Sequence, residues 1–153
     1  MTTPFPAPAL ENRRAGARLA GILPLAFAVF LVLHGLAHGF GFTVPWGLGG
    51  PRGVEYSTLI LNGSIDIGDT AVKAMSFLWL AAVFAFWLAG VMVWRGHPWA
   101  RRTAVAVVLG SLALCAIRVP GSVIGLAIDV VLLALLAVAS DKLIVRPDGR
   151  AEG

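Results

Sequence analysis

The chain has 153 residues, of which 58% are hydrophobic and only 13% are charged, and its formal net charge is +4. A soluble domain carries about 25% charged residues, and a soluble fold of this size cannot bury so much apolar surface. The composition therefore excludes a disordered chain and a soluble globular domain, and the single cysteine, Cys115, excludes an internal disulfide. The basic residues lie between long apolar runs, which indicates a lipid bilayer rather than nucleic acid as the partner.

Four apolar runs follow one another along the chain, and a membrane-spanning helix needs about 20 such residues. We expect an all-α membrane protein, a bundle of four transmembrane helices at about residues 19–42, 70–94, 103–118 and 121–141. The third run is short, but Arg118 at its end can extend its side chain to the lipid headgroups. The helices form a single domain, residues 17–143, between a flexible tail of residues 1–16 and a second tail of residues 144–153.

The basic residues are distributed unevenly between the two sides of such a bundle. Cytoplasmic segments of membrane proteins carry an excess of Lys and Arg. With four spans, nine of the twelve basic residues fall on one side: Arg13, Arg14, Arg18, Arg95, Arg101, Arg102, Lys142, Arg146 and Arg150. Both termini are therefore expected in the cytoplasm.

The connection between the first two runs, residues 43–69, is the only long loop and is expected on the outer side. It begins with a glycine- and proline-rich segment, residues 45–51. Further along, Asn62-Gly63 lies between two short β-prone segments, which favours a small β-hairpin in this loop.

A few ionisable residues lie within or beside the apolar runs, where a charge costs about 2.5–3.5 kcal/mol or more near the centre. They are His34, His38, Lys73, Arg118 and Asp129. His34 lies seven residues before Gly41, and Asp129 lies eight residues after Gly121. At a helical rise of about 1.5 Å per residue, both lie about 10–12 Å below the outer surface and can face each other.

Three interpretations of these residues remain open. His34 and His38 share one helix face and can ligate a metal ion, with Asp129 as a third ligand and Cys115 as a fourth. Alternatively, His34, His38 and Asp129 hold the head group of a quinone-like molecule, with Arg118 as a charge partner. In the third interpretation, Asp129 pairs with His34 or Arg118 only to hold the helices together.

Small residues form a stripe along the first run, comprising Gly21, Ala28, Gly35 and Gly39. Such a stripe lets two helices approach closely. It can pack against another helix of the same chain, or it can form the interface of a homodimer.

The segment Leu33-His34-Gly35-Leu36-Ala37-His38-Gly39-Phe40-Gly41 resembles the DoxX-like group of small bacterial membrane proteins. Residues 62–69 are similar to a set of uncharacterised bacterial four-helix proteins. The resemblance implies a four-helix bundle in the bacterial inner membrane, with the His34-Gly35 pair in its first helix and residues 46–51 in its outer loop. It also implies an accessory subunit of a membrane redox system, some of which are linked to thiosulfate and quinone. His38 departs from the usual pattern of the group.

We therefore expect a small redox-associated membrane subunit that binds a quinone-like molecule or a metal ion in its outer half. The candidate ligand-binding residues are His34, His38, Asp129 and Arg118, and the candidate metal ligands are His34 and His38. The expected partners are the bilayer and either another membrane subunit or a second copy. The alternatives are a structural or assembly protein without a ligand, and a small transporter. The sequence leaves open whether the protein is an enzyme.

Overall fold

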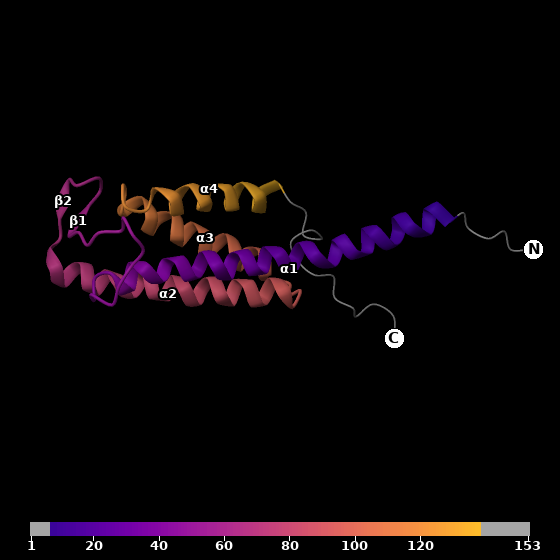
Figure 1. Ribbon diagram of the computed structural model, residues 1–153, viewed down its shortest axis with the longest axis horizontal. Helices are drawn as coiled ribbons and strands as arrows, with labels where there is room; N and C mark the ends of the chain where they lie inside the picture. Colours follow the sequence, from indigo (N-terminus) through magenta and orange to yellow (C-terminus); the bar gives the residue numbers. More distant parts are fainter. Residues whose placement is uncertain (1–6, 139–153) are drawn as a thin grey trace, which may run out of the picture.

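In a computed structural model, four helices lie side by side and one end of the bundle carries a two-stranded sheet (Figure 1). The structure describes residues 7–138, with side chains from residue 22 onward. The helices are α1 (Ala7–Thr43), α2 (Gly68–Trp94), α3 (Ala100–Ile117) and α4 (Val123–Val138), and the strands are β1 (Leu59–Ile60) and β2 (Ile65–Asp66). The largely helical fold agrees with the predicted class.

Three of these helices are long and apolar enough to cross a membrane. They are α2, α3 and the part of α1 from Ile22 to Thr43. The fourth, α4, is apolar but is described over only 16 residues. The rest of the predicted fourth run, and the tail expected at residues 144–153, lie outside the described residues. At the other terminus, α1 begins at Ala7, so the helix extends into the segment expected to be a flexible tail.

The helices pack in chain order, with α1 along α2, α2 along α3, and α3 along α4. Helices α1 and α4 make few close approaches, so a seam runs between them. Two members of the small-residue stripe, Ala28 and Gly35, lie at the α1–α2 contact: a Cβ atom at Gly35 would lie 2.5 Å from the Cβ atom of Phe86, and one at Gly90 would lie 3.0 Å from the carbonyl oxygen of Ala28. Glycine at these two positions therefore allows the backbones to approach closely.

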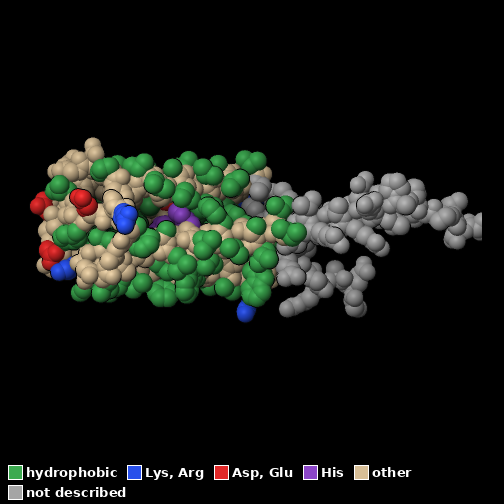
Figure 2. Space-filling view, in the orientation of Figure 1, with side chains coloured by type: hydrophobic (Ala, Val, Ile, Leu, Met, Phe, Trp, Pro, Cys, Tyr) green, Lys and Arg blue, Asp and Glu red, His purple; other side chains and the backbone are tan. Residues whose placement is uncertain are grey.

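The core contains side chains from all four helices, and Leu31, Phe86, Val108 and Leu132 are fully buried within it. Large apolar side chains also cover the outside of the bundle, whereas the charged side chains visible on this face lie toward its ends (Figure 2). An apolar belt with charged ends suits a bilayer, where lipid replaces water around the helices.

One end of the bundle, which we call the loop end, holds the last turn of α1, the first turn of α2 and the connection between α3 and α4 (Figure 1). Here β1 and β2 pair antiparallel, with Leu59 opposite Asp66 and Ile60 opposite Ile65. The predicted hairpin is confirmed. Its turn places Asn62 and Gly63 at φ of 58° and 82°, the left-handed conformation that these residue types tolerate best.

The hairpin is attached to the connection between α3 and α4. The backbone N–H groups of Leu61 and Asn62 donate to the carbonyl oxygens of Ile117 and Val119, at 2.8 and 3.0 Å. The guanidinium of Arg118 donates to carbonyl oxygens of the loop. The loop between α1 and α2 is thereby fixed across the bundle to the far helix pair.

Candidate functional site

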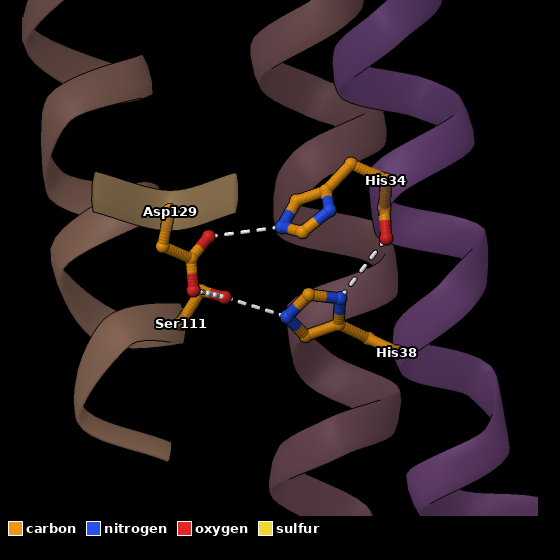
Figure 3. A network of polar contacts seen from close by, with 4 residues as sticks. All are labelled: His34, His38, Ser111 and Asp129. Atoms are coloured by element: carbon orange, nitrogen blue, oxygen red, sulfur yellow. Dashed lines mark hydrogen bonds and ion pairs between the residues drawn. The ribbon is translucent and has the colours of Figure 1, made fainter. Parts of the chain in front are cut away.

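A chain of hydrogen bonds joins four buried polar side chains in the interior of the bundle (Figure 3). His34 Nε2 lies 2.9 Å from Asp129 Oδ1, and the hydroxyl of Ser111 lies 2.6 Å from Asp129 Oδ2. The same hydroxyl lies 2.5 Å from His38 Nε2. The Nδ1 atom of His38 lies 3.0 Å from the backbone carbonyl oxygen of His34. We call His34, His38, Ser111 and Asp129 the polar network.

The network connects three helices. His34 and His38 are one turn apart on α1, so both rings project from the same face. Ser111 comes from α3 and Asp129 from α4. The contact between His34 and Asp129 therefore crosses the seam where α1 and α4 otherwise make few close approaches. The predicted common depth of these two residues is confirmed, and Asp129 pairs with His34 rather than with Arg118.

Helix α2 contributes an aromatic wall instead of a polar group. The Phe86 ring lies edge-to-face with the His34 ring, at a centroid distance of 5.0 Å, and 5.2 Å from the His38 ring. The Trp79 ring lies 5.4 Å from that of His38. These contacts cover the α2 side of both imidazoles and fix their orientation.

The network is complete only if it holds one extra proton. Because a carbonyl oxygen only accepts, His38 Nδ1 carries a proton, which leaves Nε2 of a neutral ring without one. Three contacts then remain, and each needs a proton. Two neutral imidazoles, a carboxylate and a hydroxyl supply only two, from His34 Nε2 and from Ser111. One extra proton leaves the four side chains with no net charge, as their burial favours.

A cavity of about 470 Å³ lies beside the network, between the loop end of α1 and that of α4. Both histidines line it, and its other walls are mostly apolar, with Phe40, Trp79 and Ile128 among them. Figure 2 shows histidine at the bottom of a hollow in this face of the bundle. Its volume lies within the range of about 300–1,000 Å³ that is common for small-molecule sites.

The other candidate residues are not members of the network and lie either along this cavity or at the loop end. Arg118 lines the cavity, but its guanidinium donates to the carbonyl oxygens of Ser57 and Leu59. Cys115 is buried and also lines the cavity, although it is not part of the group of possible metal ligands. Lys73 lies at the loop end, where it pairs with Asp69 at 2.9 Å.

The candidate metal ligands do converge. His34, His38 and Asp129 each offer one ligand atom, and these atoms all lie within 4.8 Å of one another. Two imidazoles and a carboxylate make up the protein ligands of many catalytic zinc sites.

Sequence reasoning did not include Ser111 among the site residues. A serine is unremarkable in an apolar helix, because its hydroxyl can bond a backbone carbonyl one turn earlier. Its position did carry a signal: Ser111 lies six residues before the end of α3 at Ile117, and Asp129 lies six residues after the start of α4 at Val123, so both lie at one depth from the loop end.

Comparison of the chain with protein-family models, with curated proteins and with solved structures gives no match. The resemblance to the DoxX-like group thus stays a prediction.

Proposed function

We propose that the protein is a four-span subunit of a membrane redox system in the bacterial inner membrane, and that its cavity binds the head group of a quinone-like molecule. The proposal places both termini in the cytoplasm and the loop end on the outer side. Three helices of spanning length, the apolar α4 and the basic residues at the opposite end of the bundle support this topology.

The cavity beside the polar network is the observation that carries the proposal. A quinone head group is a flat ring whose carbonyl oxygens become hydroxyls on reduction, so its site needs apolar walls and a few hydrogen-bonding groups. Phe40, Trp79 and Ile128 offer such walls. His34 Nε2 donates to Asp129, so its Nδ1, which makes no hydrogen bond to any described residue, can accept from a hydroxyl of the reduced ligand in the cavity.

The position of the cavity also suits a lipid-soluble ligand. It lies where α1 and α4 diverge, and the histidines at its base are visible from the side of the bundle (Figure 2). A ligand dissolved in the bilayer can therefore reach the cavity laterally. The loop above it is fixed to the α3–α4 connection and covers the aqueous side.

The test uses the purified protein in detergent micelles. We expect quinone to co-purify, as detected by mass spectrometry of the lipid extract, and a short-chain quinone to bind in equilibrium dialysis. Ile128→Trp fills the cavity and should weaken binding about tenfold, by removing about 1.4 kcal/mol of contact. Val130→Trp is the matched control, because Val130 lies two residues further along α4 and is 54% exposed on the outside.

An assembly role without a ligand is the second candidate, favoured by the way the network members bond one another. It predicts a protein that purifies without quinone, binds none, and loses only thermal stability in Asp129→Asn. That result would exclude the quinone proposal. A small transporter is less well supported, because the buried polar side chains in the described part of the chain cluster toward the loop end and do not continue through the bundle.

The topology has its own test. Reporter fusions at the C-terminus should be active only with a cytoplasmic reporter, and fusions in the α1–α2 loop only with an external one. A C-terminus on the outer side would overturn the assignment of the loop end.

A further inference from the structure

The polar network has the ligand set of a metal site, and the hydrogen bonds show how a cation would fit. We propose that His34, His38 and Asp129 bind a divalent transition-metal ion of the zinc class, with a fourth position open to the cavity. The proposal concerns the site of the proposed function and deepens it, but metal binding requires no quinone.

The number of protons in the polar network favours a metal ion. As a pure hydrogen-bond network, the four side chains lack one proton unless an extra positive charge is added. A metal ion at the centre accepts the lone pairs of His34 Nε2, His38 Nε2 and Asp129 Oδ1. Only one contact then still needs a proton, the bond from Ser111 to Asp129 Oδ2, and the hydroxyl supplies it.

The orientation of the His38 ring also suits a metal ligand. A ligating histidine usually donates its other ring N–H to a carbonyl or carboxylate, which fixes the tautomer and aims the free nitrogen at the metal. His38 already has this arrangement, since its Nδ1 donates to the carbonyl oxygen of His34 and its Nε2 points to the hydroxyl of Ser111, which is itself bonded to Asp129 (Figure 3). Ser111 would support the carboxylate in the same way.

The distances between the candidate ligand atoms are close to those of a zinc site. Ligand atoms about 2.0–2.2 Å from a tetrahedral zinc ion lie about 3.3 Å apart. His34 Nε2 and Asp129 Oδ1 are 2.9 Å apart, and the whole set lies within 4.8 Å. Small side-chain movements, in which the His38 ring leaves Ser111, therefore close the site.

The fourth position and the charge agree with an open site. One carboxylate and a divalent ion leave a charge of +1, which an anionic ligand from the cavity neutralises. Three protein ligands with an accessible fourth position are typical of catalytic rather than structural zinc sites. Both histidines line the cavity, so such a ligand can reach the ion.

The experiment uses the full-length protein in detergent micelles, stripped with a chelator and titrated with Co²⁺ and Zn²⁺. We expect one equivalent of Co²⁺ to produce the intense visible absorption of a tetrahedral site, and Zn²⁺ to abolish it. His38→Gln and Asp129→Asn should weaken binding at least about 100-fold, since losing even a supporting partner costs 10–100-fold. His97→Ala is the control, because His97 is exposed in the connection between α2 and α3 and should leave binding unchanged.

Ser111→Ala separates the metal site from a structural network. In the structure, the hydroxyl of Ser111 is hydrogen-bonded to His38 Nε2, but Ser111 is not a metal ligand in the proposed site. Cobalt binding should therefore be retained, weakened by no more than the about 10–100-fold expected for the loss of a supporting partner. Loss of binding in a folded Ser111→Ala variant, checked by circular dichroism and gel filtration, would overturn the proposal.

The remaining outcomes also decide the question. Wild-type protein without the cobalt band, or binding that persists in folded His38→Gln, would refute the metal site. If Asp129→Asn does not fold, His38→Gln decides, because glutamine keeps a polar side chain that can accept from Ser111. Quinone binding is measured on the metal-free protein, so quinone without cobalt refutes only the metal site, and cobalt without quinone refutes only the proposed function.

Discussion

Two glycines of α1, one turn apart, should respond oppositely to the same added methyl group. A Cβ atom at Gly35 would lie 2.5 Å from Phe86 Cβ and 3.4 Å from the carbonyl oxygen of Val83. Carbon atoms in normal contact lie about 3.5–4.0 Å apart, so α1 and α2 would have to separate by about 1 Å. A Cβ atom at Gly39 would meet only Val83 Cγ2, at 4.0 Å, which is ordinary contact.

The size of the effect follows from comparing Gly35→Ala with Gly39→Ala. Replacing glycine by alanine inside a helix gains about 1 kcal/mol in both variants, so this gain cancels in the difference. Overpacking a close contact costs about 1–3 kcal/mol. We therefore expect Gly35→Ala to be less stable than Gly39→Ala by about 1–3 kcal/mol, with Gly39→Ala as stable as the wild type or more stable.

The measurement is reversible unfolding in mixed micelles, with increasing sodium dodecyl sulfate and helicity followed by circular dichroism. Equal free energies of unfolding for the two variants would refute the close approach of α1 and α2 at Gly35. A Gly39→Ala variant that is the less stable of the two would contradict the assignment of this face of α1.

Three further predictions concern the loop end and the cavity. The exposed hydroxyl of Tyr56 donates to Asp69, and this bond raises the pKa of Tyr56 above its ordinary value of about 10. Because Tyr56 is the only tyrosine, a titration followed by phenolate absorbance should show the raised midpoint, and Asp69→Asn should lower that midpoint. Since the pKa is raised in the folded protein, the bond stabilises the loop fully below pH 10 and is lost as the pH rises through the folded value. Arg118→Met removes the hydrogen bonds to the loop carbonyls but keeps an apolar stem, so amide exchange in the hairpin should accelerate while exchange in α2 is unchanged. In Gly41→Ala the added methyl group would overlap the indole of Trp79 and displace it. The free energy of unfolding should fall by about 1–3 kcal/mol, and the binding of any cavity ligand should weaken. Unchanged stability would show that the indole can move freely.

Depth in the bundle was predictable from the sequence, whereas rotation about the helix axes was not. Counting residues from the helix ends placed His34 and Asp129 at one level, because the helical rise is constant. The partners of Ser111 depend on how α3 is rotated, which is decided by packing against both neighbours. Arg118 was expected to be a charge partner at the site, but the path of the loop brings carbonyl oxygens to its guanidinium.

The hydropathy of the sequence predicts the length of an apolar segment, but not the full length of the helix that contains it. The first apolar run begins near residue 19, but α1 begins at Ala7, because polar and charged residues are also good helix formers. The hairpin, in contrast, was predictable, since the conformation of Asn62-Gly63 depends on those two residues more than on their surroundings.

The order in which the helices are synthesised gives the contact across the seam a further consequence. Asp129 lies on α4, which leaves the ribosome after the other three described helices, and its partners His34 and Ser111 lie on helices already made. A carboxylate in a membrane helix costs about 2.5–3.5 kcal/mol when it is alone. If α4 spans the membrane as we propose, it therefore inserts most favourably beside a bundle that already presents both partners, and its entry depends on correct placement of α1.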